Sequence, residues 1–155
     1  MSTTVQNEAL QQMELIERGV AEIVPREELL KKLEKSIRED KPLRIKLGLD
    51  PTAPDIHLGH TVVLNKLRQF QDLGHEIHLI IGDFTGRIGD PSGKSETRKQ
   101  LSEAEIAENA ATYQQQIYKV LDRNKTIMHF NSEWLMPLNF IDVLKLAAKP
   151  DFHSQ

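Results

Sequence analysis

The chain has 155 residues, of which 39% are hydrophobic and 28% are charged, and this is the size and composition of one globular domain. Its 8 glycines, 7 prolines and net charge of −3 exclude collagen-like and disordered chains. It has no cysteine, which excludes disulfides, thiolate metal sites and cysteine nucleophiles. The 20 basic residues are balanced by 23 acidic ones, so a polyanionic partner must be held by a local site.

The sequence also lacks the marks of export and of membrane insertion. No apolar run approaches the roughly 18 residues of a transmembrane helix. The N-terminal segment contains no basic start followed by an apolar stretch, so it does not have the pattern of a secretory signal. We therefore expect a cytoplasmic protein that makes no membrane contact.

Residues 1–42 have the periodicity of two amphipathic helices. The apolar residues of the first helix recur at helical spacing up to Gly19, and Pro25 can open the second. The apolar residues of the second helix fall on one face: Leu29, Leu30, Leu33 and Ile37. The pattern predicts a helical arm that packs on the rest of the chain.

From residue 43 the pattern is that of an α/β fold. Short runs rich in aliphatic residues predict three strands, over 43–49, 76–82 and 125–130. Helical spacing predicts three further helices, over 58–73, 102–121 and 138–149. Ser102 and Glu105 have the spacing of a capping box. The alternation of strands and helices predicts a parallel sheet with helices on both faces.

The first candidate site is the segment DPTAPDIHLGH, residues 50–60, which joins the first predicted strand to the next helix. Ligands of open α/β sheets bind beyond the carboxyl ends of the strands, and a helix N-terminus suits phosphate. His57 and His60 project from one face of the first turn, and Gly59 lets a flat ligand approach the backbone. Their imidazoles and the Thr52 hydroxyl can stabilise charge that develops at phosphorus.

Two other interpretations of this segment stay open. The histidines can bind a metal, with Asp50 or Asp55 as a further ligand, or they can cap the helix. The position at the end of a strand favours the phosphate site, so we predict no protein-bound metal.

The second candidate site is the loop TGRIGDPSGKS, residues 85–95, which follows the second predicted strand. A P-loop needs a glycine at the position of Ile88, so this loop is not one. Its glycines allow close approach to a ligand, Asp90 can bind a substrate ammonium group, and Lys94 can reach phosphate. The alternative is a solvated turn with ordinary surface charge.

Three further residues have weaker patterns. His75 and His78 flank the second predicted strand and are interpreted as surface or core histidines. Trp134, the only tryptophan, is interpreted as a packing residue.

Together the motifs resemble those of class I aminoacyl-tRNA synthetases. PTAPDIHLGH is similar to their HIGH signature, and the combination with RQFQDLGH and TGRIGDPSGK is similar to the bacterial tyrosyl-tRNA synthetase family. The likeness covers about residues 43–149. It implies the N-terminal half of a Rossmann-like catalytic domain, a nucleotide-binding half of the HUP type, preceded here by the helical arm of residues 1–42.

The resemblance also implies a reaction, its partners and its residues. Tyrosine would be activated with ATP, which carries Mg²⁺, and the tyrosyl group would pass to tRNA-Tyr; the full-length form would be a homodimer. The residues implied for ATP binding are Asp50, Pro51, Thr52, His57, Gly59 and His60. Those implied for catalysis are Thr52, His57, His60 and Lys94, and those for amino-acid binding are Asp50, Thr85 and Asp90.

The sequence departs from the family in two places. Many members carry a tyrosine at the position of Lys46, where its hydroxyl meets the substrate phenol, so amino-acid identity rests on the other motifs. The family's pocket-closing helix, KMSKS loop and tRNA-binding region do not follow, and residues 150–155, PDFHSQ, form an atypical tail. We therefore expect a truncated synthetase that is inactive by itself. A stand-alone HxGH nucleotidyltransferase and a non-catalytic nucleotide-binding module are the alternatives.

Overall fold

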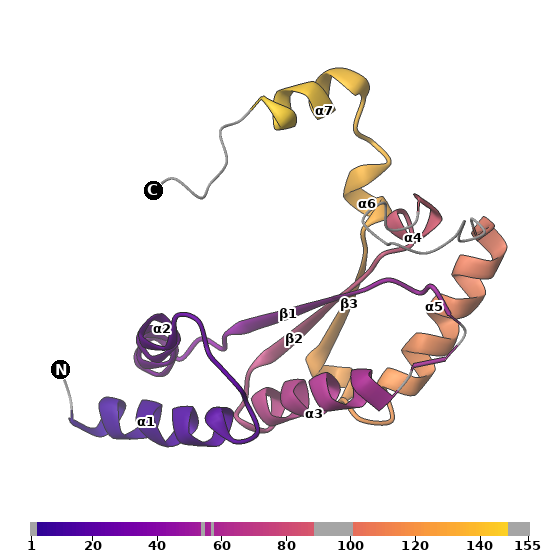
Figure 1. Ribbon diagram of the computed structural model, residues 1–155. Helices are drawn as coiled ribbons and strands as arrows, with labels where there is room; N and C mark the ends of the chain where they lie inside the picture. Colours follow the sequence, from indigo (N-terminus) through magenta and orange to yellow (C-terminus); the bar gives the residue numbers. More distant parts are fainter. Residues whose placement is uncertain (1–2, 54, 57, 89–100, 149–155) are drawn as a thin grey trace.

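The computed structural model describes residues 3–53, 55–56, 58–88 and 101–148 (Figure 1). In chain order the elements are α1 (Thr3–Glu17), α2 (Arg26–Glu39), β1 (Arg44–Leu49), α3 (Leu58–Asp72), β2 (Glu76–Ile81), α4 (Thr85–Ile88), α5 (Glu103–Ile117), the 3₁₀ turn η1 (Arg123–Lys125), β3 (Thr126–Phe130), α6 (Ser132–Leu135) and α7 (Phe140–Ala147). The three strands predicted from the sequence are confirmed. No helix within these described ranges has the length and apolarity needed to cross a membrane.

The strands form a parallel sheet in the order β1-β2-β3. Ile45 lies opposite Ile77 and Leu79 opposite Met128, so all three strands contribute apolar residues to one face. Ile77 and Leu79 are fully buried there. This face forms the centre of the hydrophobic core, as the alternation along the strands predicts.

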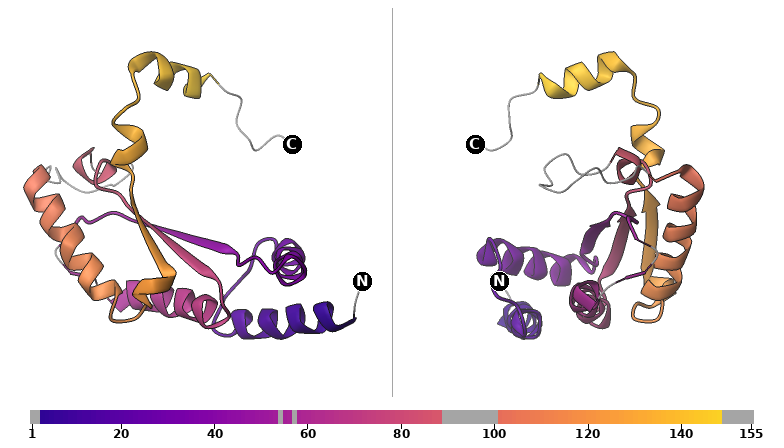
Figure 2. Two further views of the ribbon diagram at one scale, coloured as in Figure 1. Left: turned by 180° about the vertical axis from the view of Figure 1, so that it is seen from behind. Right: turned by 45° about the vertical axis from the view of Figure 1, so that its right-hand side comes forward.

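Helices pack on one face of the sheet and not on both. Side chains of α3 and α5, among them Leu64, Tyr113 and Ile117, join the cluster on the aliphatic face. The opposite face carries exposed Arg44 and Lys46, and no helix of the described ranges is seen to cover it (Figures 1 and 2). The prediction of helices on both faces is therefore wrong for this part of the chain.

The helical arm packs at the amino-terminal end of the sheet. Met13 of α1 and Leu33 of α2 are fully buried and belong to the same core cluster. Lys66 of α3 ties the arm to the body, because its ammonium donates to the carbonyl oxygens of Ile16 at 2.8 Å and Arg18 at 2.7 Å. Desolvation of this ammonium lowers the pKa of Lys66. The predicted arm is thus held by packing and by the hydrogen bonds of Lys66 to the end of α1.

Several boundaries differ from the predicted ones for identifiable reasons. Ser102 and Glu105 form the expected capping box, but α5 ends at Ile117, before the predicted residue 121. A second capping box, made by Asn139 and Asp142, opens α7 at Phe140, two residues after the predicted start at Leu138. The short helices α4 and α6 were not expected, because four-residue helices leave no periodic signal.

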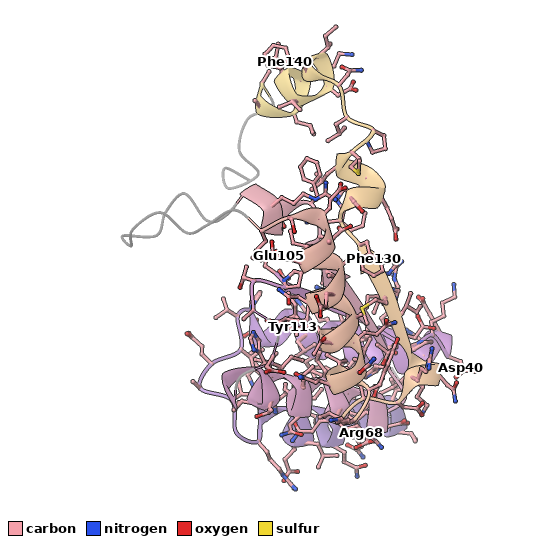
Figure 3. All side chains as sticks on the ribbon, turned by 90° about the vertical axis from the view of Figure 1, so that its right-hand side faces the viewer. Asp40, Arg68, Glu105, Tyr113, Phe130 and Phe140 are labelled. Carbon is pink, nitrogen blue, oxygen red and sulfur yellow. The ribbon has the colours of Figure 1, made fainter. Side chains whose placement is uncertain are left out.

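The C-terminal part of the described chain carries apolar side chains outside the core. Trp134 is 44% exposed and is not the packing residue that was predicted. Phe140 on α7 is 76% exposed and lies apart from the sheet (Figure 3). Exposed aliphatic residues accompany it on this helix: Ile141, Val143, Leu144 and Leu146.

His75 is a core histidine that connects the arm to the sheet. It is 3% exposed, and its Nδ1 accepts a hydrogen bond from the backbone N–H of Leu43 at 3.2 Å. This bond leaves the proton on Nε2, which donates to Oε1 of Gln12 in α1 at 3.2 Å. Burial lowers the pKa of His75 because the charged form is desolvated. The neutral imidazole is therefore the form that holds these two elements together.

We expect the stability of the chain to fall as the pH drops through 6.5, the ordinary pKa of histidine. Below pH 6.5 the histidine of the unfolded chain binds a proton, whereas the buried His75 of the folded chain does not. The free energy by which neutral His75 stabilises the fold above pH 6.5 is therefore lost as the pH falls toward its lower folded-state pKa. Urea unfolding across this range measures the effect. His75→Gln keeps polar contacts without titrating and should show a shallower pH dependence. Parallel curves for the two proteins would contradict this role.

Candidate functional site

A chain of hydrogen bonds joins the carboxyl ends of the three strands. The Thr85 hydroxyl, at the start of α4 after β2, donates to Oδ1 of Asp50, which follows β1, at 2.9 Å. Asn131, directly after β3, donates from Nδ2 to the Thr85 oxygen at 2.9 Å. Oδ1 of Asn131 in turn accepts from the backbone N–H of Phe84 at 2.9 Å. The Asp50 carboxylate is thereby oriented by hydrogen bonds that connect residues following all three strands.

Gly82 makes room for this arrangement. A Cβ atom at Gly82 would lie 1.8 Å from Oδ1 of Asp50 and 2.6 Å from the hydroxyl oxygen of Thr85. The carboxylate therefore rests directly against the backbone at the end of β2, a position that a side chain would occupy.

Helix α5 holds the loop that follows β1. Asn109 is buried and donates from Nδ2 to the carbonyl oxygen of Pro51 at 3.1 Å. Gln116 accepts from the backbone N–H of Ile56 at 2.8 Å and donates to Oδ1 of Asp55 at 2.7 Å. The side-chain amides of Asn109 and Gln116, both on α5, thus hold the loop after β1 at Pro51 and at Ile56.

Tyr113 lies between these two amides on α5 and is 2% exposed. Burial raises the pKa of its hydroxyl; a hydrogen bond with the backbone of Ala53 opposes the rise, and the carboxylates of Asp55 and Asp50 add to it. The His60 ring meets the Tyr113 ring edge to face, with centroids 6.1 Å apart. The phenol is therefore neutral at neutral pH, and its buried ring packs against His60.

The structure brings together part of the predicted site. Asp50 and Thr85, from the first and second motifs, are hydrogen-bonded to each other. Pro51 is buried, whereas Thr52 and Gly59 are exposed at the same edge. His60 is half-buried in the first turn of α3. His57, Asp90 and Lys94 lie outside the described residues, so their predicted roles stay predictions.

Sequence reasoning missed four residues that shape the site: Gly82, Asn109, Gln116 and Asn131. Gly82 and Asn131 each follow a strand directly, so their position at the carboxyl edge was a usable signal. Asn109 and Gln116 are polar residues of an otherwise ordinary helix, and only the fold reveals their partners. Within the ranges that the structure describes, no cluster of three or more His, Asp or Glu side chains could hold a metal ion.

The chain matches a known family model over most of its length. Residues 38–151 match the model described as tRNA synthetases class I (W and Y). The tyrosine–tRNA ligase of Carboxydothermus hydrogenoformans is 70% identical over 92% of this chain, and that of Moorella thermoacetica is 64% identical over 94% of it. In both cases the chain spans 35% of the relative's length.

Solved structures give the same picture. A tyrosyl-tRNA synthetase of Archaeoglobus fulgidus, complexed with L-tyrosine, is similar with a TM-score of 0.71 and 28% identity, covering 92% of this chain and 41% of that one. The tyrosyl-tRNA synthetase of Aeropyrum pernix is similar in fold, with a TM-score of 0.69 and 17% identity, over 94% of this chain and 41% of that one.

We expect Gly82→Ala to lower the free energy of unfolding by about 1–3 kcal/mol, because the new methyl group must displace the Asp50 carboxylate and the Thr85 hydroxyl. Gly48→Ala is the matched control, since nothing lies within 4 Å of a Cβ at that position in β1. Urea unfolding of both variants measures the difference. Equal losses in the two variants would mean that the close approach at Gly82 has no energetic weight.

Proposed function

The chain belongs to the class I tRNA synthetases of the tryptophan and tyrosine group, and from this we propose that it is the N-terminal part of a tyrosine–tRNA ligase. In the proposed reaction the tyrosine carboxylate attacks the α-phosphorus of ATP, and pyrophosphate leaves. The tyrosyl group then passes from AMP to the 3′ end of tRNA-Tyr. The two relatives named tyrosine–tRNA ligase support this choice of amino acid.

The observation that carries the proposal is the hydrogen bond between Thr85 and Asp50. It joins the two sequence motifs at the carboxyl edge of a parallel sheet, where open α/β folds bind their ligands. A nucleotide and an amino acid must meet at one point for adenylate formation, and this bond connects side chains that follow two paired strands, β1 and β2.

The proposed roles follow the position of each group along this edge. Thr52, His57 and His60 would donate hydrogen bonds to the phosphates and the ribose region of ATP at the start of α3. The anionic Asp90 would bind the tyrosine ammonium group, with Thr85 beside it. The cationic Lys94 would contact phosphate as charge develops there.

The proposed partners extend beyond the described residues. ATP would bring Mg²⁺ with it, as a substrate complex and not as a resident metal. The tRNA would bind through polypeptide that the relatives have in addition to the matched 35%. We also propose a cytoplasmic location, a homodimer in the full-length form, and the division into an arm of residues 1–42, a Rossmann-like half of residues 43–149 and a tail of residues 150–155.

The proposal is tested by tyrosine-dependent exchange of pyrophosphate into ATP. The 155-residue chain should bind ATP weakly and show no exchange at a useful rate, because it spans only 35% of the length of the related ligases. The same chain fused to the remaining sequence of the Carboxydothermus hydrogenoformans relative should show exchange with tyrosine. The proposed function would be contradicted if exchange by the fused protein depended on a different amino acid, or if it required no amino acid.

In the fused protein, Asp90→Asn and Lys94→Ala should have opposite effects. Asp90→Asn removes the anion with little change of shape, so tyrosine binding should weaken far more than ATP binding. Lys94→Ala should lower the rate of activation with little effect on tyrosine affinity. Equilibrium binding and single-turnover kinetics separate the two. An equal loss of tyrosine affinity in both variants would show that the loop has no separate amino-acid and phosphate ends.

A further inference from the structure

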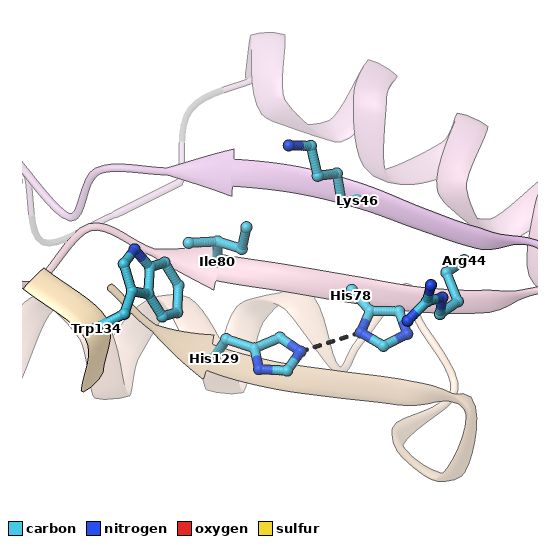
Figure 4. Close-up of a pocket in the computed structure, with 6 residues that line it drawn as sticks. All are labelled: Arg44, Lys46, His78, Ile80, His129 and Trp134. Carbon is cyan, nitrogen blue, oxygen red and sulfur yellow. Dashed lines mark hydrogen bonds between the residues drawn. The ribbon is translucent and has the colours of Figure 1, made fainter. Parts of the chain in front are cut away.

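Helix α5 contacts the loop after β1 through a row of three side chains. Asn109, Tyr113 and Gln116 recur at helical spacing, so they project from one face of the helix. Their partners follow one another along the loop: Pro51 for Asn109, the backbone of Ala53 for Tyr113, and Asp55 and Ile56 for Gln116. Because α5 packs on the aliphatic face of the sheet, these contacts hold the loop from that side. The opposite face carries a separate pocket of about 390 Å³, lined by side chains of the three strands and of α6 (Figure 4).

Gln116 makes the contacts of this row that lie nearest to α3. Its Oε1 accepts a hydrogen bond from the backbone N–H of Ile56 at 2.8 Å, and its Nε2 donates to Oδ1 of Asp55 at 2.7 Å. The two bonds need one acceptor and one donor side by side, which a side-chain amide provides and a carboxylate does not. Gln116 is half-buried, so water replaces these bonds only in part when the amide is removed.

The residues that Gln116 holds stand directly before α3. Ile56 precedes His57 in the sequence, and α3 begins two residues after Ile56. His60, in the first turn of α3, meets the ring of Tyr113 with centroids 6.1 Å apart. The row on α5 therefore contacts the chain both before α3, through Gln116, and within its first turn, through Tyr113.

We propose that Gln116 is a positioning residue for tyrosine activation, because it fixes the start of α3 and thereby the imidazoles of His57 and His60. This inference rests on the proposed function, in which both histidines donate hydrogen bonds to ATP. Donors speed the attack on the α-phosphorus only when they already lie where charge develops, so a displaced start of α3 lowers the rate constant. In the proposed function the tyrosine ammonium group binds to the loop after β2, so tyrosine affinity should not change.

The test uses the chain fused to the remaining sequence of the Carboxydothermus hydrogenoformans relative. Single-turnover formation of tyrosyl-adenylate is followed at saturating ATP and tyrosine, and tyrosine affinity is measured by equilibrium dialysis. Gln116→Leu should lower the single-turnover rate constant about tenfold and leave tyrosine affinity unchanged. Gln115→Leu is the matched control, because Gln115 is exposed on the same helix, and it should leave both quantities unchanged. A first-order rate constant does not depend on the fraction of folded protein, so a loss of folded enzyme alone would not lower it.

An exchange of polar groups tests the contact itself. Gln116→Glu keeps an acceptor for Ile56 but places a carboxylate against that of Asp55, so it should lower the rate constant at least as much as Gln116→Leu does. Asp55→Asn keeps an oxygen for the amide of Gln116 and should lower the rate constant less. In the double variant the new amide at position 55 can donate to the new carboxylate at position 116. The double variant should therefore recover most of the rate that Gln116→Glu loses.

Three results would overturn the inference. They are equal rate constants for Gln116→Leu and Gln115→Leu, a loss of tyrosine affinity in Gln116→Leu as large as its loss of rate, and a double variant no faster than Gln116→Glu. Failure of the proposed function appears separately, in the fused protein without substitutions. That protein would then form no adenylate with tyrosine, whereas failure of this inference alone leaves it fully active.

Discussion

The hydrogen bond from Thr85 to Asp50 is the contact on which the rest of the candidate site depends. A free carboxylate at the end of a strand can adopt several rotamers. Here the Thr85 hydroxyl, which accepts a hydrogen bond from Asn131, donates to the Asp50 carboxylate, which lies against the bare backbone of Gly82. Asn131 is the buried member of this group, at 7% exposed, whereas the Asp50 carboxylate itself is exposed to solvent. The position of the Asp50 carboxylate therefore depends on residues that follow β2 and β3 as well as on its own strand.

Helix α5 extends this order to the loop after β1. Its capping box fixes where the helix starts, and the register that follows places Asn109 and Gln116 under Pro51 and Ile56. Because the same helix packs Ile117 into the core, its position is set by hydrophobic burial and not by the loop. Core packing on one face of the sheet thus determines the geometry at its carboxyl edge.

The sequence was sufficient for the elements and for the general location of the site. Alternation of aliphatic residues marks β1, a short apolar run marks β2, and the Ser102–Glu105 spacing marks the start of α5. It was not sufficient for contacts between distant segments. Nothing near Asn131 indicates that its amide meets Thr85, 46 residues earlier in the chain. The uncovered face was missed for a different reason: a strand with one polar face and one apolar face was read as though a helix covered both.

The uncovered face also explains why polar and apolar residues alternate so strictly along β1. Arg44 and Lys46 would be costly to bury without partners, whereas Ile45 and Leu47 pack against the core. The two faces of β1 consequently differ: Ile45 and Leu47 pack against the core, whereas Arg44 and Lys46 are exposed. A substitution of an exposed residue on the polar face of β1 should therefore disturb the core little, because these residues are not part of the hydrophobic cluster beneath them.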